Sequence, residues 1–133
     1  MKRQQGMSSL ALVLLLLVIG TLTLAGLNQQ LDAFARIASG ERQSILHHAM
    51  AQSALEWGRN QLWPTVPDIQ CRQAAQGRVC LRATGDNRVL LIAGSSEFLL
   101  WRGGAIQEGR VFFSPHGWSD FCPVKEAALC QLP

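Results

Sequence analysis

Residues 10–27 read LALVLLLLVIGTLTLAGL, and they decide the class of this protein. All eighteen residues are apolar or small, and no ionisable side chain occurs between Gln4 and Leu31. At about 1.5 Å per residue, a helix of this length covers roughly 27 Å, which is enough for the hydrocarbon layer of a membrane. We therefore expect a transmembrane helix here.

The charges beside this apolar segment, residues 10–27, predict its orientation. Lys2 and Arg3 precede it, whereas Asp32 and Arg36, the first charges after it, cancel. Positive residues are retained on the cytoplasmic side of a membrane. We expect a single-pass protein of the inner membrane with a cytoplasmic N-terminus and a periplasmic C-terminal part.

The exported part has little net charge. The 133 residues carry twelve Lys and Arg against nine Asp and Glu, and two of the twelve are Lys2 and Arg3. Binding of DNA or RNA is usually signalled by a concentrated basic surface. The composition therefore argues against nucleic acid as a direct partner.

A helical pattern continues beyond the apolar segment. Apolar side chains recur at spacings of three and four up to Trp57, and the first proline is Pro64. We expect one helix over residues 8–62. For the organisation of the chain, we assign residues 7–27 to a membrane half and residues 28–63 to an amphipathic half, each of which includes one residue beyond an end of this helix.

Residues 64–133 are predicted to form a small β head. Four runs rich in strand formers are separated by turn residues: 78–83, 88–93, 98–102 and 110–113. We expect an antiparallel meander whose apolar face rests on a helix stripe that carries Leu46, Met50, Ala54 and Trp57. The predicted fold class is α+β, with a long N-terminal helix packed on a small antiparallel sheet.

Four cysteines lie in the exported part. An even number in a small extracytoplasmic domain indicates two disulfides, for which three connectivities are possible. We favour the local pairs, Cys71 with Cys80 across a hairpin and Cys122 with Cys130 in the tail. A zinc site is disfavoured because the spacings contain no CxxC, and we expect neither a metal nor a cofactor.

Other polar and aromatic residues have simpler explanations than catalysis. Ser114, His116 and Asp120 share one turn-rich stretch, whereas a catalytic triad is assembled from separate elements. His47 and His48 are adjacent on the predicted helix, which is poor geometry for one metal ion. We expect the four tryptophans to pack inside the head, with one or two exposed in the last loop as interface anchors. The protein is not expected to be an enzyme.

Three fates are possible for the N-terminal segment. A signal peptidase could cut after the small residues Thr23-Leu24-Ala25, or the segment could stay as an uncut anchor. Alternatively, the short basic leader, residues 1–6, could be removed after Gly6. The helical pattern that runs on without a break favours retention of the apolar segment.

These features together resemble the type IV pilin and pseudopilin superfamily. The basic leader that ends in Gly6, the uncharged stretch that begins at Met7, the extended helix and the small cysteine-bearing head all match it. Residues 8–14 and the tail Gly117-Trp118-Ser119-Asp120-Phe121-Cys122-Pro123 are most similar to YgdB-like, prepilin-peptidase-dependent minor pilins. The resemblance implies cleavage between Gly6 and Met7 by prepilin peptidase and N-methylation of Met7.

The resemblance also implies partners and a location. Other minor pilins, the major pilin and an inner-membrane assembly platform would be the partners of such a subunit. After processing it would move from the inner membrane into a type IV pilus or a pseudopilus of the kind used in type II secretion.

Two positions depart from the family pattern. Met7 stands where Phe is usual, and Ala11 occupies the fifth mature position, where Glu is usual. Subunits of this kind that lack the acid are tip-type minor pilins, so Ala11 favours a subunit that initiates or caps a filament. The alternative is a secreted, disulfide-bonded binding domain with a cleaved signal peptide.

Overall fold

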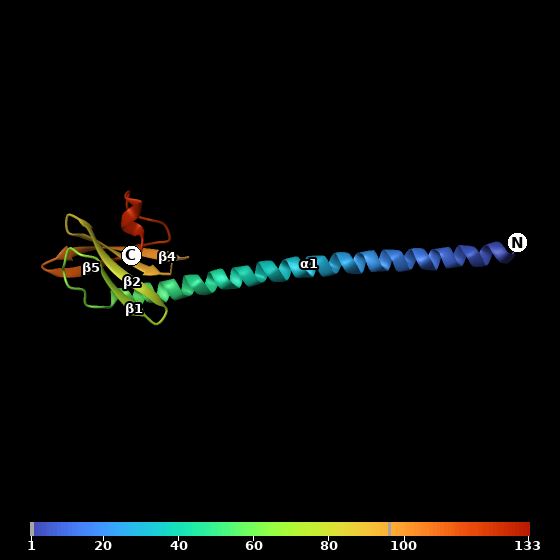
Figure 1. Cartoon of the computed structure of the whole chain (residues 1–133), viewed down its shortest axis with the longest axis horizontal. Coiled ribbons are helices and arrows are strands. Elements are labelled where there is room, and N and C mark those ends of the chain that lie inside the picture. The colour runs from blue at the N-terminus through green and yellow to red at the C-terminus, as the bar shows by residue number, and fades with distance from the viewer. Residues whose placement is uncertain (1, 96) are drawn as a thin grey trace. The chain divides into compact units, whose positions relative to one another are not determined.

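The computed structural model describes residues 2–95 and 97–133 (Figure 1). One α-helix, α1 (Lys2–Arg59), is followed by five strands and a short 3-10 helix, Ala127–Cys130. The chain divides into two compact units, Met1–Gln43 and Ser44–Pro133, which we describe separately. We call the second unit the head.

Helix α1 ends three residues before the predicted boundary of 62. Its last carbonyl groups are satisfied locally: the side-chain amide of Asn60 donates to the carbonyl of Glu56 at 2.8 Å, and that of Gln61 donates to the carbonyl of Trp57 at 3.3 Å. Such bonds replace the partners that a helix loses at its C-terminus. The prediction was wrong at this end because it used Pro64 as the stop signal and ignored these amides.

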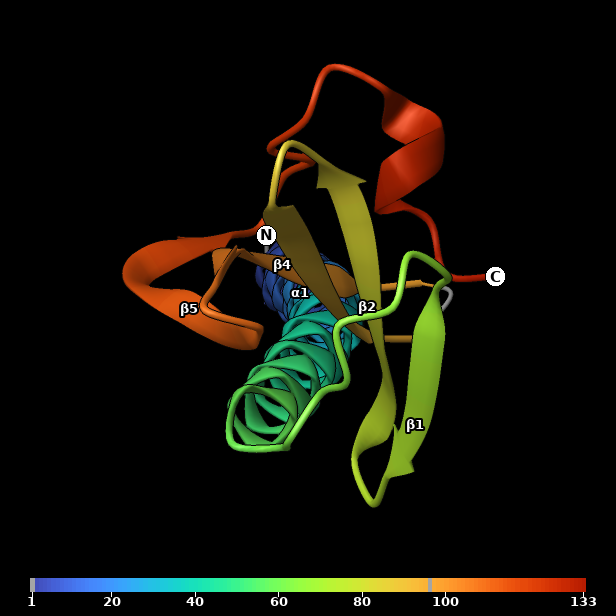
Figure 2. The same cartoon turned by 90° about the vertical axis from the view of Figure 1, so that its left-hand side faces the viewer.

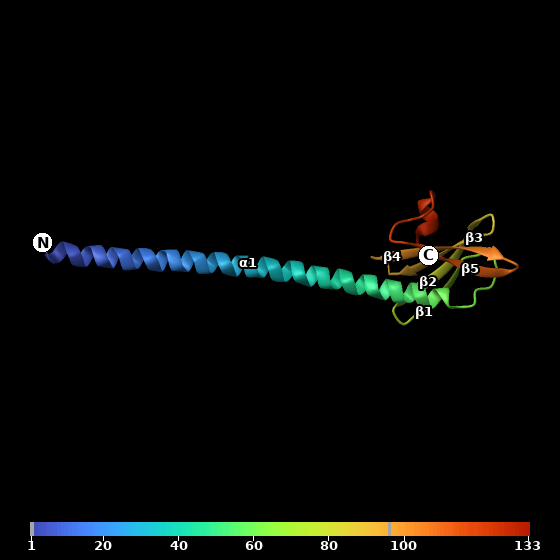
Figure 3. The ribbon, with the colours of Figure 1, turned by 180° about the vertical axis from the view of Figure 1, so that it is seen from behind.

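The strands labelled in Figure 3 form one antiparallel sheet, and their order in that sheet is β1-β2-β3-β4-β5. Their bounds are β1 Gln70–Ala74, β2 Gly77–Gly85, β3 Arg88–Gly94, β4 Leu99–Gln107 and β5 Arg110–Ser119. The turn between β2 and β3 has Asp86 at φ 42° and Asn87 at φ 60°, and a two-residue hairpin turn of this type requires positive φ at both positions. The predicted meander and the α+β class are therefore confirmed.

Two strands are longer than predicted. Strand β4 continues through Gly103 and Gly104 to Gln107, and β5 includes residues 114–119, which the sequence analysis assigned to a turn-rich stretch. The pairing of β4 with β5 shifts its register between Arg102 and Gly104, so β5 accommodates the Ser-Pro-His-Gly residues as an irregularity. The turn-forming residues 114–117 indicated the irregularity in β5, but they did not indicate that the strand continues to Ser119.

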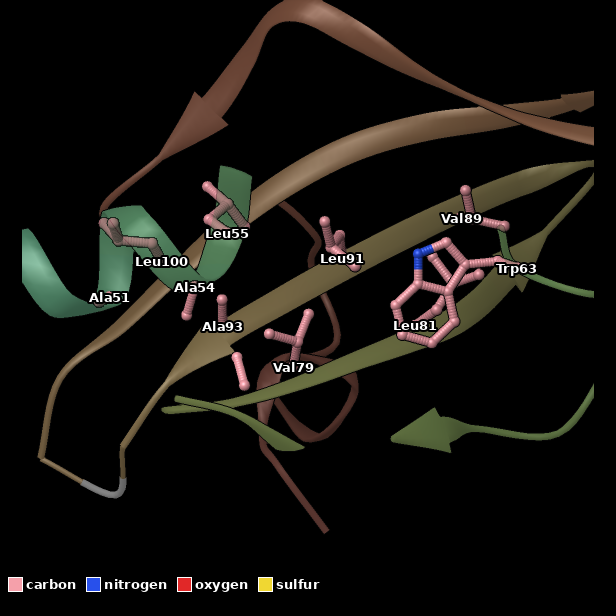
Figure 4. Packing of buried hydrophobic residues seen from close by; sticks show 11 residues of the cluster. Ala51, Ala54, Leu55, Trp63, Val79, Leu81, Val89, Leu91, Ala93 and Leu100 are labelled. Atoms are coloured by element: carbon pink, nitrogen blue, oxygen red, sulfur yellow. The ribbon is translucent and has the colours of Figure 1, made fainter. Parts of the chain in front are cut away.

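The main core lies between the last turns of α1 and one face of the sheet (Figure 4). It contains Ala51, Ala54, Leu55, Trp63, Ala74, Val79, Leu81, Val89, Leu91, Ala93 and Leu100. The predicted helix stripe was partly wrong: Ala54 is buried and Trp57 packs against the core, but Leu46 and Met50 are exposed. Ala51 and Ala54 face the sheet together with the large side chain of Leu55, which the predicted stripe did not include.

Gly58 shows how close this packing is. A Cβ atom added to it would lie 2.5 Å from Cγ1 of Val79, a fully buried side chain. Glycine weakens a helix by about 1 kcal/mol relative to alanine, but here it permits contact between helix and strand.

A second, smaller core covers the opposite face of the sheet. Leu90 and Ile92 of β3 pack there against the C-terminal segment, including the buried Cys130. Figure 2 shows the last turns of α1 and the C-terminal segment on opposite sides of the strands. The head is thus a three-layer unit in which the sheet is covered on both faces.

The structure contains two disulfides, Cys71–Cys80 and Cys122–Cys130, which are the predicted local pairs. The first joins residues directly opposite each other on β1 and β2. The second closes the C-terminal segment over Leu90 and Ile92.

One buried charge links the layers. Arg102 of β4 is only 4% exposed, and its guanidinium donates to the carboxylate of Glu56 on α1 and to the carbonyl of Ser114 on β5, the latter at 3.0 Å. Removing one member of such a pair leaves an uncompensated charge. Arg102 therefore joins the helix, β4 and β5.

We expect Gly58→Val to lower the free energy of unfolding of the head by about 2 kcal/mol, because overpacking a close contact costs roughly 1–3 kcal/mol. Gly40→Val is the matched control, since an added Cβ there meets nothing within 4 Å. Urea denaturation of the full chain in detergent, followed by tryptophan fluorescence, measures both. Equal effects of the two substitutions would contradict the proposed helix–sheet contact.

For the disulfides, non-reducing peptide mapping should recover the pairs Cys71–Cys80 and Cys122–Cys130. Replacing Cys122 and Cys130 together by Ala should destabilise the head by about 2–3 kcal/mol, because the loop they close is no longer restrained in the unfolded chain. A crossed pairing, or an unchanged denaturation midpoint, would show that this assignment is wrong.

Candidate functional site

The most unusual surface of the chain is the apolar segment of α1, residues 10–27. Every side chain from Gly6 to Gln43 is exposed in the structure. Within the described residues, α1 is long and apolar enough to cross a membrane, and none of its most apolar 18-residue window is buried inside the protein. Exposed apolar surface of this extent marks contact with lipid or with another protein.

The polar atoms of this segment are satisfied within the helix. Three hydroxyl groups donate to the carbonyl three residues earlier: Ser9 to Gly6 at 3.0 Å, Thr21 to Val18 at 2.8 Å, and Thr23 to Gly20 at 2.9 Å. An unsatisfied polar group in hydrocarbon costs several kcal/mol. These hydroxyls therefore do not oppose insertion into a bilayer, a detail that the sequence pattern did not reveal.

A shallow apolar groove runs along the same segment. It is lined by Val13, Leu16, Leu17, Gly20, Thr21 and Leu24. An added Cβ on Gly20 would meet nothing within 4 Å, so the helix backbone is accessible at this point. Small residues let the backbones of two helices approach closely in lipid.

The predicted processing residues lie in the first turns of α1. Gly6 and Met7 are helical and exposed, and an added Cβ on Gly6 would touch nothing within 4 Å. Ala11 follows Met7 by four residues, so both lie on one face of the helix. Met1 of the predicted leader, residues 1–6, lies outside the described residues.

Ser114 and His116 lie in β5, and Asp120 directly follows that strand. All three are exposed, and within the described residues no hydrogen bond or ion pair joins their side chains. In the part of the chain that the structure describes, no three His, Cys, Asp or Glu side chains are placed to hold a metal ion.

The histidines and tryptophans have structural contacts. His47 and His48 are half-buried, with Nδ1 of His47 4.0 Å from Oε2 of Glu97 and the ring of His48 edge-on to Phe98. Trp63 is buried, and its indole donates to the carbonyl of Gly58 at 2.7 Å. Trp118 of β5 remains about half exposed.

Comparison with known proteins gives a family but no close relative. No curated protein and no solved structure matches this chain. One family model matches residues 15–130, which include most of the apolar segment and nearly all of the head. The chain therefore belongs to the family described as "protein of unknown function (DUF2509)".

Proposed function

We propose that this protein is a membrane-anchored, prepilin-like subunit that helps to initiate or cap a type IV pilus or a related pseudopilus. The observation that carries this proposal is the exposed apolar segment, residues 10–27, in a chain whose head has its own two-sided core. The helix that holds this segment continues into the head, so that anchor and head share one element.

The environment of the apolar segment would change during assembly under this proposal. In the inner membrane it contacts lipid, and in a filament it contacts the helices of neighbouring subunits. Its hydroxyl groups bond within the helix, so they need no polar partner in lipid or in a filament. The groove at Gly20 leaves room for a neighbouring helix to approach closely. The partners would be other minor pilins, the major pilin and the inner-membrane assembly platform.

Processing would release the leader, residues 1–6. Prepilin peptidase would cut between Gly6 and Met7 and methylate the new amine of Met7. The open surroundings of Gly6 support this role, because nothing in the described fold requires glycine there. The role itself is structural and requires no catalysis by this chain.

Ala11 supports a position at the start or tip of the filament. A lone carboxylate in hydrocarbon is costly and persists only beside a partner such as an amine. A first subunit has no earlier subunit to supply that contact, so Ala at this position costs it nothing.

The alternative function is a secreted, disulfide-bonded binding domain, which the two disulfides also support. Intact-mass measurement of the protein from membranes, with and without prepilin peptidase, separates the two functions. Peptidase-dependent loss of residues 1–6 supports the pilin-like subunit. A soluble product that begins at Gly26 would exclude it.

We expect Gly6→Val to leave the chain full length and bound to the membrane, with few filaments, because the peptidase must bring a backbone without a side chain to its catalytic carboxylates. Gly26→Val is the control: it adds the same side chain at another open position of α1 and should be processed normally. Immunoblotting of membrane fractions reports the cut. Normal processing of Gly6→Val would refute the site.

Ala11→Glu should be processed normally but should reduce initiation or move the subunit into the shaft. The unpaired acid costs about 2–3 kcal/mol at full depth in the bilayer and less near its boundary. Ala11→Gln tests whether charge is responsible. Filament counts and gold labelling in a complemented deletion strain measure the outcome, and more filaments than wild type with label along their length would show the tip assignment to be wrong.

A further inference from the structure

The C-terminal segment, residues 120–133, lies on the face of the sheet opposite the last turns of α1 (Figure 2). We call this segment the flap. Beneath it are four large apolar side chains of β3 and β4: Leu90, Ile92, Leu99 and Trp101. The flap contributes Cys122, Val124, Cys130 and Leu132 to the contact. It therefore covers apolar surface that β3 and β4 would otherwise expose.

Few polar contacts hold the flap to the sheet. The indole of Trp101 donates to the carbonyl of Cys130 at 2.9 Å, and the guanidinium of Arg78 donates to the carbonyl of Pro133 at 2.8 Å. Among the described residues, no main-chain hydrogen bond and no ion pair joins the flap to the strands. A region with so few contacts opens at a lower free energy than the whole domain unfolds.

The disulfide of the flap does not fasten it to the sheet. Cys122 and Cys130 both belong to the flap, so their bond closes a loop within it. The loop also holds the 3-10 helix Ala127–Cys130, in which the amide of Leu129 donates to the carbonyl of Glu126 at 3.0 Å. Because the loop stays closed, movement of the flap frees few dihedral angles inside it. The flap can therefore leave the sheet and return as one formed unit.

The main core does not include the flap. Neither its buried residues nor the partly buried residues around it lie beyond Phe113. The flap is connected to the sheet through the end of β5 at Ser119, and the two residues that follow, Asp120 and Phe121, are exposed. A hinge at these two residues would let the flap move without disturbing the packing of α1 on the sheet.

We propose that the flap opens as a disulfide-closed unit and uncovers an apolar face of the sheet, while the core between α1 and the sheet stays folded. In the closed state the flap keeps this face from solvent and from other proteins, for which exposed apolar surface is a contact site. The device belongs to the head and does not depend on the proposed role in a filament.

Two indole N–H groups report on the two faces of the sheet separately. That of Trp101 donates to the flap, and that of Trp63 donates to the carbonyl of Gly58 at 2.7 Å in the main core. The test uses NMR to follow the exchange of both protons with deuterium in the ¹⁵N-labelled full chain in detergent micelles. Trp101→Phe and Trp63→Phe identify the two resonances. We expect Trp101 to exchange faster than Trp63, at a rate that changes little with urea below the unfolding transition, because flap opening exposes little surface.

A substitution in the main core separates flap opening from global unfolding. Leu55→Ala should accelerate exchange at Trp63 at least tenfold, which corresponds to about 1.4 kcal/mol. It should leave the rate at Trp101 unchanged, because the main core is intact both before and after the flap opens. Val79→Ala, at another fully buried position of this core, is the milder variant if Leu55→Ala does not fold.

A substitution in the flap shows whether Trp101 reports its opening. Leu132→Ser removes an apolar contact with the sheet and should accelerate exchange at Trp101 about tenfold. Gln131→Ser changes the adjacent, exposed position and is the matched control, so the rate should stay as in the original chain.

Equal acceleration of both protons by the main-core variant would show that the flap opens only when the whole head unfolds, and it would overturn the proposal. Equal rates at Trp101 in Leu132→Ser and Gln131→Ser would overturn it as well. None of these substitutions alters the predicted processing site, so the result is separate from the outcome of the Gly6 experiment.

Discussion

The approach of α1 to the sheet is the constraint on which the rest of the head depends. Ala51, Ala54 and Gly58 present almost no side chain toward the strands, so the helix lies close enough for Leu55 to fill the core. Neither partner is sufficient alone, since a small meander and a single amphipathic helix each bury too little to be stable in water. The ion pair between Glu56 and Arg102 fixes the helix on this surface at a position where β4 and β5 also meet.

Features written in local sequence were predictable. Four features depend on residues that are neighbours in the chain: the long apolar helix segment, the meander, the turn at Asp86-Asn87 and the local disulfides. The helix face that packs on the sheet was not predictable, because α1 carries apolar residues around much of its circumference. The sequence also gives no reason for a glycine at position 58, which becomes clear only from its contact with Val79. Likewise β5 continues through Ser114 because Arg102 binds its carbonyl, a contact between residues on different strands.

The candidate sites divide in the same way. The junction at Gly6 and the position of Ala11 follow from a motif, and the structure adds only that both are open and exposed. The setting of His48 depends on tertiary contacts. Its ring lies edge-on to Phe98, fifty residues further along the chain, and the sequence around His48 does not show this neighbour. The assignment of the chain to a family leaves its activity open, so the physical chemistry of these surfaces carries the functional argument.

The placement of the two disulfides has a mechanical consequence. Cys71–Cys80 joins β1 to β2, and Cys122–Cys130 lies within the C-terminal segment, so neither bond crosses from α1 to the sheet. The loop after Arg59 is the covalent connection from α1 to the strands. All other force applied along α1 reaches the strands through side-chain packing and the Glu56–Arg102 pair. If tension separated the helix from the sheet, the disulfides would still hold β1 beside β2 and keep the loop of the tail closed, although the sheet would have lost half of its core. The contact between helix and sheet is thus the part of the head that no disulfide reinforces against force.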